Sequence, residues 1–205
     1  LNSLELFNRI DFELDEIGTP IPFRWGKCKL ATASYGHGIT TTPLQLAKAY
    51  SIIGNGGYKI KPTLIKKTQD IEFQEQVISN KTSNQLNTIL RKVVSNEEGT
   101  ANFANIDGYE VAGKTGTALK YNSKEKINTF ASLFPASNPK YVLVVLLDEP
   151  KVAPLNHVFV RPDGKKYKNI KRNESGWNAV IISGKIIERI GPILAIKNLQ
   201  ASRNF

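Results

Sequence analysis

Apolar positions recur with a helical period in residues 43–53, where one face of the predicted helix collects the side chains of Leu46, Tyr50 and Ile53. Thr42 stands just before Pro43, and Gln45 lies three positions after the threonine. This order is typical of a capping box with proline at the first helical position. The glycines at 54, 56 and 57 then stop the helix. We therefore predict a helix over residues 43–53 with most of its length in the core.

Two further segments follow the helical period. Residues 81–94 carry apolar side chains at Leu86, Ile89, Leu90, Val93 and Val94. The last segment, residues 177–190, is rich in isoleucine and valine and ends at Gly191 and Pro192, a pair that predicts a sharp stop. We expect this last helix to pack across one face of a sheet.

Three apolar segments with short connections predict that sheet, over residues 111–118, 127–134 and 141–147. Short connections between successive strands favour an antiparallel meander. The expected fold class is α+β, an antiparallel sheet flanked by helices. Residues 58–67 predict a further strand at an edge, interrupted by Pro62. The turn sequence R-P-D-G in a basic segment, residues 158–172, predicts an exposed hairpin insertion.

Length and composition indicate one domain of a globular protein, with residues 1–30 irregular, 31–196 forming the core and 197–205 a tail. The 205 residues contain no methionine, so we expect a fragment or a processed chain. Residues 141–147 form the longest apolar run, which is too short to span a membrane. Cys28 is the single cysteine, which excludes an internal disulfide and a Cys/His metal set.

The charge of the chain is strongly positive, with 28 Lys and Arg against 18 Asp and Glu and a formal net charge of +10. The lysines are scattered apart from one cluster at residues 165–172. This distribution favours general basicity over a nucleic-acid site. We expect no metal and no cofactor.

The candidate chemistry lies in the predicted strand at residues 111–118. Gly116 removes a side chain from its middle, and a glycine inside a strand often marks the close approach of a ligand. Lys114, Thr115 and Thr117 surround that gap with a cation and two hydroxyls, which suits a substrate with a carboxylate. The plain alternative is a threonine-rich strand with a solvated lysine. His37 and His157 each lie in a loop, where a histidine more often makes a loop hydrogen bond than catalyses.

A nucleotide site is the competing hypothesis. Residues 108–115 fit the P-loop pattern, and residues 142–149 resemble an acidic Walker B strand. A P-loop must follow a buried strand and open a helix, whose N-terminus holds the phosphates. Residues 102–107 do not predict a strand, and Gly116 with Thr117 disfavours a helix start. The context therefore argues against an ATPase.

Three motifs together carry a resemblance to a known family. Residues 34–57, the triplet Gly99-Thr100-Ala101 and residues 111–118 resemble the C-terminal half of penicillin-binding protein transpeptidases. The likeness covers most of residues 20–192 and is closest to the class B, monofunctional enzymes of cell division. It implies the penicillin-binding and serine β-lactamase-like transpeptidase fold, in an incomplete form, with an unpaired sheet edge at residues 141–147 and a tendency to aggregate.

The family's mechanism uses Ser-x-x-Lys, Ser-x-Asn and Lys-Thr-Gly motifs. A serine attacks the penultimate D-alanine carbonyl of a peptidoglycan stem peptide, and the acyl group then passes to an amine of a neighbouring strand. In the family the first two motifs precede the segment that resembles residues 34–57. Formal matches at residues 123–126, 137–140 and 202–204 all follow Lys-Thr-Gly, in polar loops, a proline turn and the tail, and we attribute them to chance. We expect this chain to lack its nucleophile and to be inactive alone.

The resemblance also implies roles for the strand. Lys114 and Thr117 would be catalytic, with the Thr117 N–H as an oxyanion donor, and Thr115, Gly116 and Thr117 would bind the carboxylate of the substrate or of a β-lactam. The implied partners are D-alanyl-D-alanine stem peptides, β-lactams and proteins of the division or elongation machinery. The implied location is the periplasmic side of the inner membrane. A non-catalytic domain that keeps the fold remains the third reading.

Overall fold

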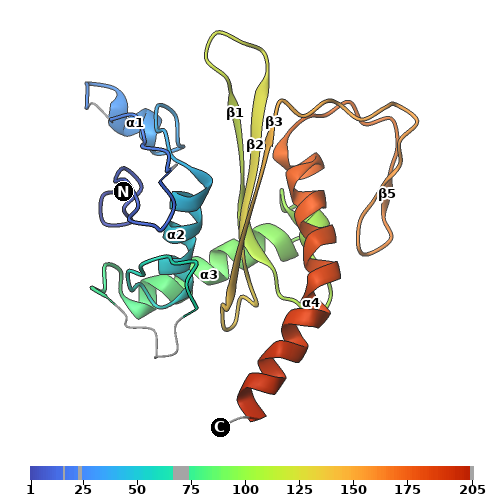
Figure 1. Cartoon of the computed structure of the whole chain (residues 1–205). Coiled ribbons are helices and arrows are strands. Elements are labelled where there is room, and N and C mark those ends of the chain that lie inside the picture. Colours follow the sequence, from blue (N-terminus) through green and yellow to red (C-terminus); the bar gives the residue numbers. More distant parts are fainter. Residues whose placement is uncertain (16, 23–24, 67–73, 204–205) are drawn as a thin grey trace. The chain divides into compact units, whose positions relative to one another are not determined.

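The structure, a computed structural model, describes residues 1–15, 17–22, 25–66 and 74–203, with side chains as far as Gln200. The chain divides into two compact units, Leu1–Asn84 and Gln85–Phe205. Helix α3 (Asn80–Ser95) begins in the first unit and continues into the second. In Figure 1 the colours follow the chain from the N-terminus (blue) to the C-terminus (red).

The first unit contains α1 (Lys29–Ala33) and α2 (Pro43–Gly54). The predicted capping box of α2 is confirmed: the Gln45 N–H donates to Thr42 Oγ1 at 3.2 Å, and the Thr42 N–H donates to Gln45 Oε1 at 2.8 Å. The predicted buried face is wrong, because the buried side chains are those of Gln45, Ala49 and Ile52. The Gln45 amide also donates to the carbonyl of Asn8, which turns that face inward.

The strand predicted at residues 58–67 is not formed. Among the described residues this segment holds a single antiparallel bridge between Tyr58 and Gln76. Lys67 lies outside the described residues. Pro62 has no N–H to donate, which disfavours a continuous strand through this segment.

The second unit is built on the predicted meander of β1 (Ala112–Leu119), β2 (Lys126–Phe134) and β3 (Tyr141–Asp148). The strand order is β1-β2-β3, and both pairings are antiparallel. β2 is central and mostly buried, with Phe130 and Leu133 fully covered. Helix α4 (Ala179–Arg203) packs along β2 and β3 (Figure 1). The predicted antiparallel α+β arrangement is confirmed.

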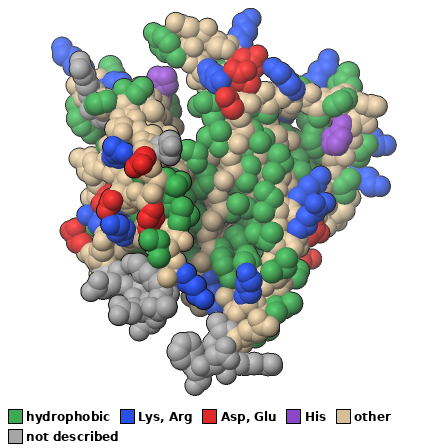
Figure 2. Space-filling model, viewed as in Figure 1, with side chains coloured by type: hydrophobic (Ala, Val, Ile, Leu, Met, Phe, Trp, Pro, Cys, Tyr) green, Lys and Arg blue, Asp and Glu red, His purple; other side chains and the backbone are tan. Residues whose placement is uncertain are grey.

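The β3 strand lies at one end of this order, so its outer edge has no partner strand among the described residues, as predicted. Hydrophobic side chains gather over the sheet on the face seen in Figure 2. On β3 the side chains of Val142 and Val144 are half-buried, and Leu146 is 42% exposed. Within the described part of the chain, no helix combines the length and apolarity that crossing a membrane requires.

Two helix predictions need correction. Ile89, expected on the buried face of α3, is 58% exposed, whereas Val94 is buried. The stop predicted at Gly191 and Pro192 does not occur, because α4 runs on to Arg203. Gly191 leaves room for the ring of Tyr109, whose Cε1 lies only 2.1 Å from the position of an added Cβ. Beyond the proline, Asn198 accepts a hydrogen bond of 2.9 Å from the Tyr141 hydroxyl, which attaches the last turns to β3.

The predicted hairpin forms from β4 (Phe159–Val160) and β5 (Lys166–Tyr167), but its description as an exposed insertion is wrong. Phe159 is buried, and its ring and that of Tyr167 each lie within 5.4 Å of the Trp177 ring. Trp177 belongs to η2 (Ser175–Trp177), and Phe103 of η1 (Asn102–Ala104) joins the same cluster. The aromatic residues of this short hairpin thus pack it onto the core.

Candidate active site

The Lys-Thr-Gly-Thr sequence lies within β1, the strand at the other end of the sheet. Lys114 is exposed, and its Nζ lies 3.0 Å from the carbonyl oxygen of Thr115 and 3.3 Å from Thr115 Oγ1. Thr100, which stands just before η1, places its hydroxyl 3.3 Å from that of Thr115. An ammonium and two hydroxyls therefore cluster at an edge strand.

Gly116 differs from its neighbour Gly113 in the space around it. A Cβ added at Gly113 would lie 2.5 Å from the Ala131 carbonyl oxygen and 2.8 Å from the Phe130 ring. A Cβ added at Gly116 would have the Thr129 carbonyl oxygen, at 4.0 Å, as its nearest atom. The backbone of Gly116 also has no positive φ. Packing therefore explains Gly113, whereas neither packing nor backbone conformation requires glycine at 116.

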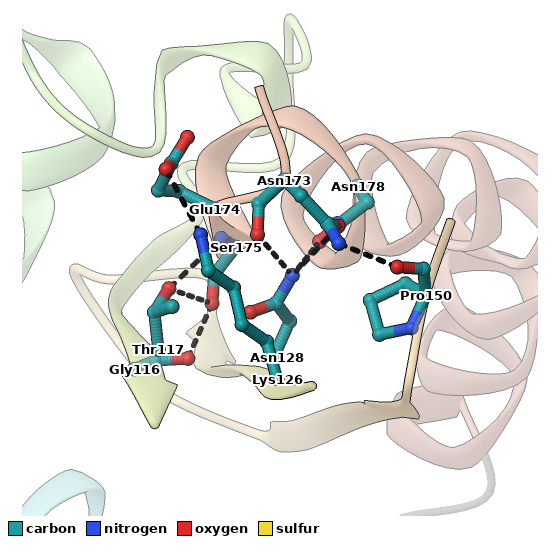
Figure 3. Close-up of polar contacts among 9 residues, drawn as sticks. All are labelled: Gly116, Thr117, Lys126, Asn128, Pro150, Asn173, Glu174, Ser175 and Asn178. Atoms are coloured by element: carbon teal, nitrogen blue, oxygen red, sulfur yellow. Dashed lines mark hydrogen bonds and ion pairs between the residues drawn. The ribbon is translucent and has the colours of Figure 1, made fainter. Parts of the chain in front are cut away.

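Ser175 of η2 bonds the same stretch of β1 (Figure 3). Its side chain is fully buried, and its hydroxyl donates to the Gly116 carbonyl. The Ser175 oxygen also accepts from the Thr129 N–H at 3.2 Å and lies 2.9 Å from Thr117 Oγ1. Since the Ser175 proton goes to Gly116, Thr117 is the donor in that hydroxyl pair. The Ser175 N–H returns a bond of 3.1 Å to Thr117 Oγ1.

Three asparagines continue this attachment toward α4 (Figure 3). Asn128, which lies opposite Thr117 on β2, donates to the Asn173 carbonyl at 3.0 Å and to Asn178 Oδ1 at 3.1 Å. Asn173 in turn donates to the Pro150 carbonyl at 2.5 Å. Asn178 Oδ1 accepts the Ala179 N–H at 2.7 Å, which caps the start of α4. The segment before α4 is thus bonded to both the sheet and the helix.

A pocket of about 510 Å³ opens beside β1. Its walls come from β1, from the segment around η1, and from the hairpin with η2. The lining side chains are mainly those of Thr100, Phe103, Lys114, Thr115, Tyr167, Arg172 and Trp177. This size and this mixture of aromatic and polar groups are typical of a small-ligand site. Glu174 also lines the pocket, but its carboxylate is bound by Lys126 at 3.2 Å.

The structure excludes the P-loop hypothesis. Lys114 lies inside an antiparallel strand, not at the N-terminus of a helix. The acidic residues of the Walker B-like segment, Asp148 and Glu149, are both bound at 2.7 Å by the ammonium of Lys120. A phosphate in this position would find neither a helix dipole nor a free acidic group for its metal ion.

The sequence predicted four neighbouring site residues, Lys114, Thr115, Gly116 and Thr117, and missed those that reach them from elsewhere. Thr100 belongs to the Gly99-Thr100-Ala101 motif, for which no role was predicted, and Arg172 belongs to the basic cluster at residues 165–172, which was attributed to general basicity. Ser175 gave no signal, because its closeness to β1 depends on the fold. The ring of His157 packs edge-on against that of Phe159, with 4.6 Å between their centroids. In the described part of the chain no group of three or more His, Cys, Asp or Glu side chains is placed to hold a metal ion.

These features define a transpeptidase domain of the penicillin-binding kind: an antiparallel sheet with a Lys-Thr-Gly-Thr edge strand, helix α4 packed along the sheet, and a pocket beside that strand. Residues 4–172 match the family described as penicillin binding protein transpeptidase domain, and the chain belongs to this family.

Similarity to individual proteins supports the same family assignment. The chain is 34% identical, over 90% of its own length, to the probable peptidoglycan D,D-transpeptidase FtsI of Caulobacter vibrioides. It is 36% identical over 69% of its length to the stage V sporulation protein D of Bacillus subtilis. It covers 32% and 24% of those two proteins. Its structure is similar to the transpeptidase domain of Burkholderia pseudomallei penicillin-binding protein 3, with a TM-score of 0.75, 25% identity, and coverage of 94% of this chain and 55% of that one.

Proposed function

We propose that this chain is the substrate-binding, C-terminal part of a peptidoglycan D,D-transpeptidase that cross-links stem peptides in cell-wall synthesis and cell division. The observation that carries the proposal is the open space at Gly116, in an edge strand whose neighbours offer an ammonium and a hydroxyl. A peptide ending in D-alanine can lie along such an edge with its carboxylate beside these groups.

Each residue of the strand has a proposed role that follows from its chemistry. Lys114 supplies positive charge, and the Thr115 hydroxyl binds the terminal carboxylate of a D-alanyl peptide or of a β-lactam. The Thr117 N–H stabilises the oxyanion of the tetrahedral intermediate, a charge that develops only during reaction. The Thr117 hydroxyl donates to Ser175, so it joins the carboxylate only when that proton turns to the ligand.

The proposal extends to the protein that contains this chain. The nucleophilic serine would come from a Ser-x-x-Lys motif outside these 205 residues. The chain alone, as the C-terminal part of a single transpeptidase domain, would be inactive. The expected tail at residues 197–205 is wrong as far as Arg203, because α4 continues to that residue. The full-length protein would act on the periplasmic side of the inner membrane with division or elongation proteins. Neither a metal nor a cofactor is needed for this chemistry.

Acylation by a fluorescent penicillin tests the proposal. The full-length protein is expected to become labelled, and the 205-residue chain is expected to remain unlabelled. Lys114→Gln should slow labelling of the full-length protein by roughly 100-fold, the effect typical of losing one electrostatic stabiliser of a transition state.

The matched control is Lys140→Gln, which removes another exposed lysine, at the turn before β3, and should leave labelling unchanged. Labelling of the chain alone would contradict the assignment of the nucleophile. Reversible binding of penicillin without acylation by the full-length protein would instead favour the non-catalytic domain.

A further inference from the structure

The pocket beside β1 carries more positive charge than the Lys-Thr-Gly strand supplies. Arg172 lines it together with Lys114, and Glu174 is the acidic residue of the lining. Because Lys126 binds the Glu174 carboxylate at 3.2 Å, that charge is already compensated. Arg172 is exposed and forms no ion pair or hydrogen bond with the described side chains or backbone, so its five N–H donors are available to a ligand.

Contacts before and after Arg172 in the chain hold its segment in place. Upstream, the hairpin is held by Arg161, which donates to the Glu97 carbonyl at 3.3 Å and to the Tyr167 hydroxyl at 3.2 Å. Downstream, the Asn173 carbonyl accepts the amide of Asn128 at 3.0 Å. The chain is therefore held at Tyr167 and at Asn173, and a ligand need order only the short segment between them and the Arg172 side chain.

The dimensions allow one ligand to meet both cations. A pocket of about 510 Å³ is about 10 Å across if taken as a sphere, which is the scale of a dipeptide or a small bicyclic drug. The aromatic rings of Phe103, Tyr167 and Trp177 line the same space. The pocket therefore suits a ligand that joins a carboxylate to an apolar body. A planar guanidinium binds a carboxylate through two parallel hydrogen bonds, which an ammonium cannot do.

We propose that Arg172 is a specificity-determining residue that binds the substrate carboxylate together with Thr115, and that the hairpin of residues 158–172 serves to deliver it. This inference rests on the proposed function and adds to it the group that selects free carboxylates. It also gives the basic hairpin a role at the site.

The test compares acylation of the full-length protein by benzylpenicillin and by its methyl ester, which lacks the negative charge. Arg172→Gln should lower the second-order rate of acylation by benzylpenicillin roughly 10-fold, the equivalent of one charge-assisted hydrogen bond. The rate for the ester should change less than about 2-fold, since the ester offers no charge for Arg172 to bind. For benzylpenicillin, the acylation rate of Arg172→Lys should lie between those of the parent and Arg172→Gln. Added salt should reduce the difference in this rate between the parent and Arg172→Gln.

Lys171→Gln is the matched control, because it removes the same charge from an exposed neighbour that does not line the pocket. It should leave both rates unchanged, and both variants should melt at the temperature of the parent. Equal loss with the two ligands, or an Arg172→Gln variant that behaves as Lys171→Gln, overturns the inference while the proposed function stands. Absence of any acylation of the parent protein refutes the proposed function itself, and this inference with it.

Discussion

At the scale of single residues, two glycines three positions apart in one strand have different reasons to be there. Gly113 is enclosed by the Ala131 carbonyl and the Phe130 ring, so the fold requires it. At Gly116 no atom beyond its two chain neighbours lies closer than 4.0 Å to an added Cβ, so packing does not require the glycine, and we propose that an approaching ligand does. The contrast assigns Gly113 a packing role and leaves the binding role proposed for Gly116 to experiment.

The pair Gly116→Ala and Gly113→Ala turns that contrast into a prediction. Gly113→Ala should lower the free energy of unfolding by roughly 1–3 kcal/mol, because the new methyl group overpacks the core. Gly116→Ala should change it by less than about 0.5 kcal/mol, as for most open positions. Its rate of acylation by penicillin should nevertheless fall by about 10-fold or more, since the methyl group fills space left for the ligand.

Urea unfolding measures the first quantity and fluorescent-penicillin labelling of the full-length protein measures the second. A Gly116→Ala variant that is as active as the parent would remove the main support for the proposed site. A strongly destabilised Gly116→Ala variant would show that the glycine is there for folding.

At the scale of elements, the site depends on a connection between η2 and the β1–β2 pair. Ser175 bonds the two backbone groups of one register pair, the Gly116 carbonyl and the Thr129 N–H, from the turn that precedes α4. The asparagines at 128, 173 and 178 extend this attachment to the helix N-terminus. The orientation of β1 is therefore coupled to the start of α4.

Ser175→Ala should accordingly lower the free energy of unfolding by roughly 1–3 kcal/mol, because it removes a buried hydroxyl and leaves its partners unpaired. It should also slow acylation, since the Thr117 hydroxyl and the Gly116 carbonyl lose their common partner. The control is Ser95→Ala at the end of α3, an exposed serine whose loss should be close to neutral in both measurements. Equal stability of the Ser175→Ala variant and the parent would contradict the structural role.

At the scale of the whole molecule, the balance of charge makes the protein sensitive to acid. The 28 Lys and Arg side chains are opposed by 18 Asp and Glu, so protonation of the carboxylates leaves a large repulsive charge. Several carboxylates are bonded in the folded state. The pKa of Asp11 is lowered by its bond with Lys61, that of Glu13 by Thr63, that of Glu110 by Ser137, and that of Asp163 by the Lys165 N–H.

A carboxyl group whose pKa is lower in the folded state contributes stability above its unfolded pKa, near pH 4, and loses that contribution as the pH falls through the folded pKa. Thermal unfolding midpoints should therefore be nearly constant from about pH 7 to 5 and fall steeply below about pH 4. In Asp163→Asn the fall should be smaller, since one of the titrating groups is gone. A midpoint that rises on acidification would contradict this assignment.

The expected tendency of the chain to aggregate belongs to the same scale and stays a prediction. Its structural basis is the outer edge of β3, which has no partner strand in the described part of the chain and carries half-buried valines beside the 42% exposed Leu146. Edges of this kind favour pairing with another chain.

Features that depend on neighbours along the chain could be predicted from the amino-acid sequence. The capping box at Thr42 and Gln45, the three-strand meander and the R-P-D-G turn are local patterns of hydrogen bonding and polarity, and each formed as expected. The family could also be predicted from the sequence, because the motifs that identify it are short and local. Local periodicity was less informative about burial, as the inward turn of Gln45 and the exposure of Ile89 show.

The residues that contact the Lys-Thr-Gly strand from distant segments could not be predicted before the fold was known. Ser175 and Thr117 are 58 positions apart, and no local pattern encodes their bond. The continuation of α4 past Pro192 and the packing of the hairpin onto Trp177 likewise depend on side chains from distant segments, which override the local stop and turn signals. The physical reason is that a pocket is a property of surfaces brought together by the burial of apolar groups, and that burial is settled by the whole fold.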